Sequence, residues 1–157
     1  MACEQEATAA VQCIALQNGL TLQLGSWEHL AQAAKHVRFE VFVKEQAVPV
    51  EMELDEFDAL STHAVIFDSE LLALATGRLL PDGHIGRMAV VANARGMGLG
   101  AQVLESLIHE AQKKAFPEVV LSAQVHAMGF YERFGFVAEG DVYLDCAIAH
   151  KDMRLVF

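Results

Sequence analysis

The chain has 157 residues, of which 54% are hydrophobic and 20% are charged, and this composition excludes an intrinsically disordered protein. We expect a single domain over residues 1–157, since nothing in the sequence marks a linker or a repeat. The longest apolar runs are too short to span a bilayer, and the acidic start, Met1 to Glu6, does not resemble a secretory signal. With only three widely spaced cysteines, the sequence favours a cytoplasmic protein without a disulfide framework and without a membrane partner.

The net charge of −10 argues against nucleic acid as a partner, because a phosphate backbone would be repelled. The charge is unevenly distributed along the chain. Residues 1–70 contain 12 acidic and 3 basic side chains, whereas residues 71–157 contain 9 acidic and 8 basic ones. We therefore expect the first part to meet cations and the second part to be able to host an anion.

The N-terminal elements can be predicted from local signals. Asn18-Gly19 lies between two apolar segments and predicts a β-hairpin, so residues 1–18 would add an extra hairpin strand. Ser26 is expected to cap a helix that begins at Trp27 and ends before Pro49.

The rest of the chain alternates between β-branched runs and helical periodicity, which indicates an α+β (α/β) fold. Strands are expected at 63–67, 71–76, 84–91, 119–123 and after Phe136, and helices at 99–115 and 127–133.

A glycine-rich loop, Arg95-Gly-Met-Gly-Leu-Gly100, opens directly into a helix. Unpaired backbone N–H groups at a helix N-terminus bind phosphate, and an arginine at the loop entrance adds charge, although such glycines can also serve tight packing alone. A P-loop is excluded because neither Lys nor a hydroxyl follows Gly100. A dinucleotide site is disfavoured because the next strand ends at Ser122-Ala-Gln124, without an acid.

The segment Met88 to Gly100 resembles motif A of the GNAT superfamily of acyl-CoA N-acyltransferases, and Gln124 to Phe136 resembles its motif B. The pattern Arg38-x-x-Val-Phe-Val-x-Glu-Gln-x-x-Pro49, with Gly86-Arg87 and His150-x-x-Met153, is similar to the ElaA-like branch. The resemblance implies a GNAT fold: a mixed, mostly antiparallel sheet of about six or seven strands flanked by about four helices. Its strands would be splayed near Val90 and Gln124.

The resemblance also implies acetyl-CoA as co-substrate and places its contacts. Tyr131 matches the general acid that protonates the departing thiolate, with an interfacial aromatic as the plainer alternative. A backbone N–H near Val90 would polarise the thioester carbonyl. The cofactor-binding residues implied are Met88, Ala89, Val90, Arg95, Gly96, Met97, Gly98, Leu99, Gly100, Ala101, Gln124 and Phe130.

The amine that attacks the thioester must lose a proton, and an acid-rich segment lies where the family's acceptor loop is expected. An ordinary solvated loop would have the same composition. We expect a cationic acceptor, either a small molecule such as a polyamine or aminoglycoside-like base, or a peptide lysine. Glu53 and Asp55 are the candidates for the base or water-positioning group. The acidic residues are Glu45, Glu51, Glu53, Asp55, Glu56 and Asp58.

Arg38, Glu45, His63 and His150 are candidate acceptor-binding residues, although Arg38 and Glu45 are also spaced to form an ion pair on one helical face, and a histidine near the pocket could be the base. No histidine or cysteine pair has metal-ligand spacing, so no metal is expected. The predicted function is an N-acetyltransferase that acts by direct attack through a tetrahedral intermediate. The alternative is a catalytically silent acyl-CoA sensor, and in either case the high apolar fraction is compatible with a homodimer.

Overall fold

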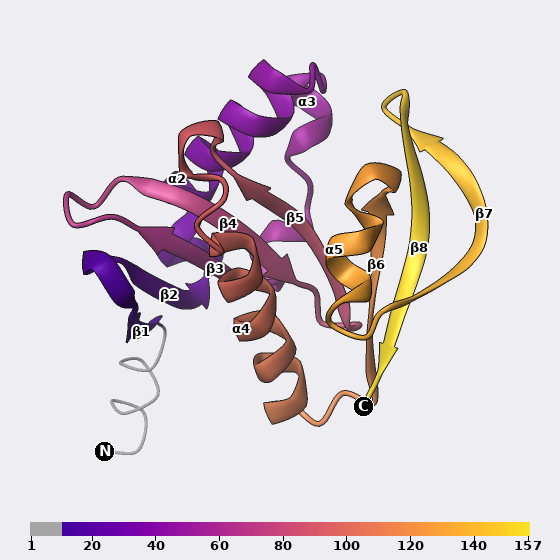
Figure 1. Cartoon of the computed structure of the whole chain (residues 1–157). Helices are drawn as coiled ribbons and strands as arrows, with labels where there is room; N and C mark the ends of the chain where they lie inside the picture. The colour runs from indigo at the N-terminus through magenta and orange to yellow at the C-terminus, as the bar shows by residue number, and fades with distance from the viewer. Residues whose placement is uncertain (1–10) are drawn as a thin grey trace.

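A mixed β-sheet organises the part of the chain that the computed structural model describes, residues 11–157. Its eight strands run in the order β1-β2-β3-β4-β5-β6-β8-β7, and only the β5–β6 pair is parallel (Figure 1). The strands are β1 (Val11–Ala15), β2 (Thr21–Ser26), β3 (Thr62–Phe67), β4 (Ala73–Leu79), β5 (His84–Val90), β6 (Glu118–Gln124), β7 (Val137–Asp145) and β8 (Ile148–Val156). The helices are α2 (Trp27–Arg38), the π-helix η2 (Phe39–Glu45), α3 (Val50–Glu53), α4 (Leu99–Lys113) and α5 (Met128–Glu132).

The predicted N-terminal hairpin is confirmed by the pairing of β1 with β2. Asn18 and Gly19 have φ angles of 60° and 76°, the left-handed conformation that Asn and Gly tolerate best. The hairpin strand begins at Val11, and residues 1–10 of the expected segment lie outside the described residues.

Two hydrophobic cores form on opposite faces of the sheet, one under α2 and one under α4. The alternation of side chains along β3 serves both, because Ala64 and Ile66 join the α4 core while Val65 joins the α2 core. Strand β4 is buried along its whole length, as expected of a strand covered on both faces. Figure 1 shows α4 in front of these strands and α2 behind them.

Helix α2 begins at Trp27 as predicted, and its buried residues Leu30, Ala34 and Val37 continue to Val41 in η2. The predicted cap is wrong in one detail, since Ser26 occupies the N-cap position but makes no side-chain cap hydrogen bond. The helical turn widens to a π-helix after Arg38, a form often found at functional sites.

The sheet divides between β5 and β6. These strands pair only where His84 and Ile85 meet Val120 and Leu121, and they separate beyond that point. The splay predicted near Val90 and Gln124 is therefore confirmed, and in Figure 1 the part carrying β6, β8 and β7 stands apart from the rest of the sheet. The eight strands exceed the six or seven that the family resemblance implied, and the added edge strand is β1, the extra hairpin strand that Asn18-Gly19 predicted.

A β-bulge shapes the part of β5 beside this split. Gly77 of β4 faces two residues of β5, Arg87 and Met88, and Arg87 has a φ of 50°. Gly77 allows Met88 to pack there, because a Cβ on Gly77 would lie 2.6 Å from the Met88 Sδ. The bulge thus changes the direction of Arg87 at the edge of the split.

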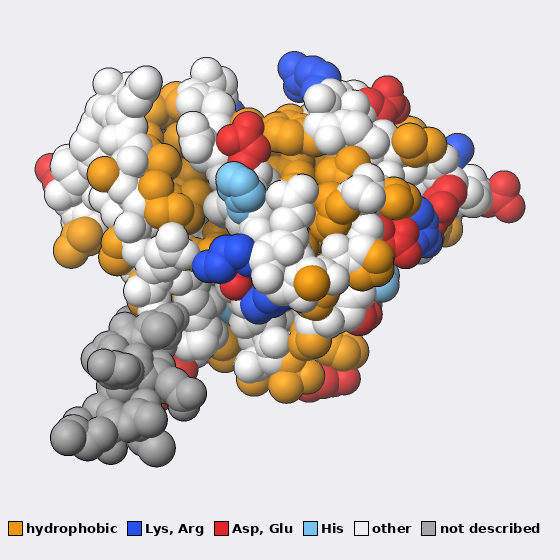
Figure 2. Space-filling model, turned by 90° about the horizontal axis from the view of Figure 1, so that it is seen from below, with side chains coloured by type: hydrophobic (Ala, Val, Ile, Leu, Met, Phe, Trp, Pro, Cys, Tyr) orange, Lys and Arg blue, Asp and Glu red, His pale blue; other side chains and the backbone are white. Residues whose placement is uncertain are grey.

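The surface carries mixed charges. On the face shown in Figure 2, Lys and Arg side chains are scattered among acidic and hydrophobic ones. Among the helices of residues 11–157, none has the length and apolar character needed to cross a membrane.

Candidate active site

A cavity of about 520 Å³, here called the central cavity, lies where β5 and β6 separate. Side chains from η2, β5, β6, α5 and the β7–β8 turn line it. It brings together predicted residues that are far apart in the sequence, namely Glu45, Glu53, Met88, Arg95, Gln124, Tyr131 and His150.

A second cavity of about 570 Å³, here called the loop cavity, is formed by the glycine-rich loop. Gly98 is the N-cap of α4 with a φ of 77°, so the N–H groups of the first turn have no helical partner. A Cβ on Gly96 or Gly98 would meet nothing within 4 Å, which leaves open space against the backbone. The cavity is lined by Val90, Ala94, Arg95, Gly96, Gly98, Leu99, Gly100, Ala101, Phe130, Arg133 and Phe134.

The backbone of Val90 faces the split in the sheet. The Val91 N–H donates to the Leu74 carbonyl at 2.9 Å, and groups alternate along an antiparallel ladder. The Val90 N–H and carbonyl must therefore point away from β4, toward the side where β6 has separated. This orientation makes the Val90 N–H available to a group bound between the strands.

Arg95 lies at the boundary of both cavities. It donates to the two carboxylate oxygens of Glu45 at 2.7 and 2.8 Å, and its Nε donates to the Val90 carbonyl at 3.0 Å. The hydrogen bonds from Arg95 hold the pKa of Glu45 below its ordinary value. Arg95, whose charge is predicted to bind phosphate, is thus already paired with Glu45, and a phosphate would have to compete with that carboxylate.

Gln124, at the end of β6, has a similar partner. Its side-chain amide donates to Gln46 Oε1 at 2.9 Å. Two consecutive residues, Glu45 and Gln46, therefore connect the end of η2 to both sides of the split, through Arg95 and Gln124 respectively.

Tyr131 lies at the inner wall of the central cavity and is only 9% exposed. Its ring packs edge-on against Phe130 and Phe136. Burial raises the pKa of Tyr131 to about 12, so the phenol keeps its proton over the whole physiological range. Such a group can donate a proton but cannot act as a base at neutral pH.

A largely buried ion network pairs three of the six acids of the acid-rich segment with three arginines. Arg38 donates to Glu53 and, at 2.8 Å, to Asp58. Arg78 donates to Asp55 and Asp58, both at 2.7 Å. The third arginine, Arg87, donates to Asp55 at 3.3 Å. Since charges in low dielectric are stable only when paired, the network fixes the loop over the cavity floor.

The network separates the two predicted base candidates. Hydrogen bonds from Arg78 lower the pKa of Asp55 to about 2, which makes it a weak base, and Asp55 does not line the central cavity. Glu53 lines the cavity, and among residues 11–157 only one of its carboxylate oxygens, Oε1, has an arginine partner. Glu53, although largely buried, is thus the one of the two candidates that lines the central cavity.

Two predicted acceptor-binding residues lie elsewhere. Arg38 is fully buried and pairs with Glu53 and Asp58, so the predicted Arg38–Glu45 ion pair is wrong. His63 is 1% exposed, donates from Nε2 to the Asp58 carbonyl at 2.8 Å, and is inaccessible to an acceptor. Burial lowers the pKa of His63, which favours its neutral form.

Two predicted cofactor-binding residues also line neither cavity. Ala89 is buried in the α2 core, and Met97 has an exposed side chain. Both residues belong to the motif, but their side chains form part of neither cavity.

His150 reaches the central cavity. Its Nδ1 donates to the Ile148 carbonyl at 2.7 Å, which leaves Nε2 as a proton acceptor when the ring is neutral. The ring stacks on Tyr143 with centroids 6.0 Å apart. His150 is therefore held in one orientation at the cavity wall.

The structure also changes the interpretation of the acidic segment. Four of its acids, Glu45, Glu53, Asp55 and Asp58, are paired with arginines. The other two, at positions 51 and 56, are exposed. The charge that suggested a cationic acceptor is thus largely balanced within the protein.

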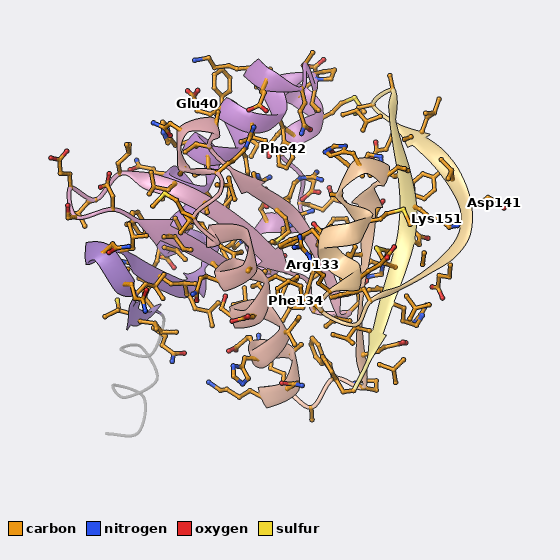
Figure 3. The ribbon with its side chains drawn as sticks, viewed as in Figure 1. Glu40, Phe42, Arg133, Phe134, Asp141 and Lys151 are labelled. Atoms are coloured by element: carbon orange, nitrogen blue, oxygen red, sulfur yellow. The ribbon has the colours of Figure 1, made fainter. Side chains whose placement is uncertain are left out.

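Sequence reasoning gave no role to Arg87, Gln46 or Arg133, although all three lie at the cavities. Figure 3 labels Arg133 and Phe134 at the end of α5 beside α4. The Arg133 guanidinium lies 6.0 Å from the centroid of the Phe130 ring. The only sequence feature that pointed to Arg87 and Arg133 is their positive charge within the Gly86-Arg87 pattern and the Gln124 to Phe136 segment.

Comparison with known proteins decides the family. Residues 28–157 match the sequence profile described as the acetyltransferase (GNAT) domain. The chain belongs to the GNAT acetyltransferase family. Among curated relatives of this GNAT protein is the uncharacterized N-acetyltransferase YjcF of Bacillus subtilis, 35% identical over 129 residues, which cover 80% of this chain and 92% of YjcF.

Solved structures agree with this membership. An acyl-CoA N-acyltransferase from Pseudomonas aeruginosa is 35% identical with a TM-score of 0.77, and the match covers 86% of this chain and 98% of that one. Escherichia coli ElaA is 26% identical with a TM-score of 0.76, over 86% of this chain and 98% of ElaA. The predicted resemblance to the GNAT superfamily and its ElaA-like branch is confirmed.

Proposed function

We propose that this GNAT protein transfers an acetyl group from acetyl-CoA to a primary amine by direct attack. The observation that carries the proposal is the meeting of the two cavities at Arg95: the phosphate-suited loop cavity opens beside the central cavity that Tyr131 lines. A thioester held between them would lie near one proton donor, Tyr131, and one carboxylate, Glu53.

The residues present suit the polyphosphate part of coenzyme A. The first-turn N–H groups of α4 can donate hydrogen bonds to phosphate oxygens, for which Gly96 and Gly98 leave open space. Arg95 and Arg133, which also line this cavity, supply positive charge. Gln124, in exchange for its contact with Gln46, can hydrogen-bond the amide-rich pantetheine arm, as can the backbone of Met88 and Val90.

A residue of this chain can be assigned to each step of the acetyl transfer. Glu53, or a water that it orients, takes a proton from the ammonium, and the neutral amine attacks the thioester carbon. The Val90 N–H stabilises the oxyanion of the tetrahedral intermediate. The C–N bond forms and the C–S bond breaks, and the departing thiolate takes the phenolic proton of Tyr131. The nitrogen then loses its second proton, which restores the proton on Tyr131.

The experiment is a thiol-release assay with acetyl-CoA and a panel of primary amines, combined with mass spectrometry of the protein. The proposal expects amine-dependent release of coenzyme A with no acetylated enzyme intermediate. Binding of acetyl-CoA without turnover of any amine would instead support a catalytically silent sensor.

A further inference from the structure

Arg87 is a cationic side chain that is only partly used by the protein. It lies on the β5 bulge, lines the central cavity and keeps 30% of its side chain exposed. Its Nε donates to the Glu53 carbonyl at 3.2 Å and its Nη2 to Asp55 at 3.3 Å. Within residues 11–157, no group accepts a hydrogen bond from its Nη1. One edge of the guanidinium is therefore held by the protein while the other is available at the cavity.

The surroundings of Arg87 favour an additional anion. Arg38 and Arg78 hold the network's carboxylates at shorter distances than Arg87 does. Burial, followed by the positive charges of Arg78 and Arg38, lowers the pKa of Arg87. Arg78 also lines the cavity, and its Nε is the one buried side-chain nitrogen or oxygen of residues 11–157 without a hydrogen-bond partner. Arg78 Nε and Arg87 Nη1 are thus two arginine nitrogens at the cavity floor without a hydrogen-bond acceptor among the described residues.

The other acidic side chains at the cavity do not pair with Arg87. Glu45 is paired with Arg95, and Asp145 is exposed at the end of β7 and forms no ion pair with Arg87 within residues 11–157. Arg87 and Cys146 of the β7–β8 turn nevertheless line the same cavity. The space between Arg87 and the turn is where an acceptor anion would be bound.

Glu53 stands beside this cation. The Arg87 Nε lies 4.0 Å from Glu53 Oε1, and both side chains line the cavity. In an α-amino acid the nitrogen and the carboxylate carbon are attached to one carbon and lie about 2.5 Å apart. A carboxylate and a guanidinium at neighbouring positions complement such a zwitterion, whereas a diamine would leave the Arg87 donors unpaired.

We propose that the acceptor is an amino acid or a similar small amine with a carboxylate beside its nitrogen. Arg87 binds the carboxylate through Nη1, and Glu53 receives the ammonium group that becomes the nucleophile. This inference rests on the proposed acetyltransferase function and replaces a cationic acceptor with a zwitterionic one.

The first test compares free amino acids with their carboxamides and with diamines in the thiol-release assay. The acids should exceed the matched amides in kcat/KM by about tenfold or more, since a charge-assisted hydrogen bond is lost in the amide. Arg87→Gln should remove this preference and Arg87→Lys should retain part of it. Arg154→Gln, on β8 outside both cavities, is the matched control and should keep the preference. Equal use of acids and amides by the wild type would overturn the inference.

A second test reads binding without turnover. Saturation-transfer NMR with N-acetylalanine and N-acetylalaninamide should show binding of the acid to the wild type and its loss in Arg87→Gln, with thermal unfolding used to verify that the variant is folded. Binding of both probes alike, or of neither, would overturn the inference whether or not any amine is acetylated. Turnover restricted to diamines would also overturn it while leaving the acetyltransferase function in place.

Discussion

Glu45 at the end of η2 and Arg95 at the entrance of the glycine-rich loop form a two-hydrogen-bond ion pair across the boundary of the two cavities. The pair joins positions 50 residues apart in the sequence. Because phosphate needs the same guanidinium edge, the carboxylate of Glu45 competes with the ligand that Arg95 is proposed to bind.

Glu45→Gln should therefore bind acetyl-CoA more tightly than the wild type, by up to about fivefold for an exposed pair worth about 1 kcal/mol or less. Isothermal titration with acetyl-CoA measures this change. Glu40→Gln is the matched control, since Glu40 (labelled in Figure 3) lies on the same π-helix but pairs with Lys44 and lines neither cavity. Weaker binding in Glu45→Gln would show that Arg95 does not exchange partners.

Gly98→Glu should lose acetyl-CoA binding while remaining folded. A Cβ at this position meets no atom within 4 Å, so the substitution destabilises the fold only through the strain of a positive φ, about 1 to 2 kcal/mol. The new carboxylate repels the phosphates of acetyl-CoA. Gly98→Gln has the same shape without the charge and should bind at least tenfold more tightly than Gly98→Glu, a factor of about ten being 1.4 kcal/mol. Equal affinities of the two variants would contradict the role of the loop.

Tyr131→Phe should lower kcat by about a hundredfold, the lower range for loss of a general acid, with little change in acetyl-CoA binding. With a pKa of about 12, Tyr131 stays protonated through the assay range. If kcat declines between neutral pH and about pH 10, another group causes the decline, so the same decline should be seen in Tyr131→Phe. A basic limb that disappears in Tyr131→Phe would assign that titration to Tyr131 and refute its high pKa.

Arg38→Met should destabilise the protein by about 3 to 5 kcal/mol, because it leaves buried Glu53 and Asp58 without their shared cation. Urea unfolding at pH 7 gives this value. Arg154→Met removes solvent-accessible pairs with Glu118 and Glu139 and should change the free energy of unfolding little. If the two variants unfolded at the same urea concentration, the network would not be a source of stability.

The pH dependence of stability should reflect Asp55. Its pKa falls from 3.8 to about 2 on folding, so its stabilisation is complete above the unfolded value and is lost as the pH drops through the folded one. The difference in unfolding free energy between the wild type and Asp55→Asn should be constant from pH 7 to 5 and shrink as the pH falls from about 4 to 2. A difference that grew with acid would reverse the assigned shift.

Much of the fold and half of the site follow from local sequence. Local sequence predicts the Asn18-Gly19 hairpin, the start of α2 and the glycine loop, because each depends on residues that are adjacent in the chain. The partners of Arg38 depend on how the segment after η2 packs over β4, so seven-residue helical spacing to Glu45 suggested the wrong one. Tertiary packing decides such long-range choices.

The same reasoning explains why Glu53 and Asp55 could not be distinguished beforehand. They are two residues apart in one acidic run, yet one faces the cavity and the other faces Arg78. Arg87 sits at a β-bulge opposite Gly77, and the alternation of residue types along a strand does not indicate where such a register shift occurs.

The most direct measurement of the central claim is the stoichiometry of acetyl transfer with the wild type and Tyr131→Phe. Coenzyme A release and N-acetylated amine are quantified in the same reaction. We predict one acetylated amine per coenzyme A released, at a rate that falls about a hundredfold in Tyr131→Phe. Coenzyme A release without acetylated amine, or no release with any amine despite acetyl-CoA binding, would contradict the acetyltransferase function.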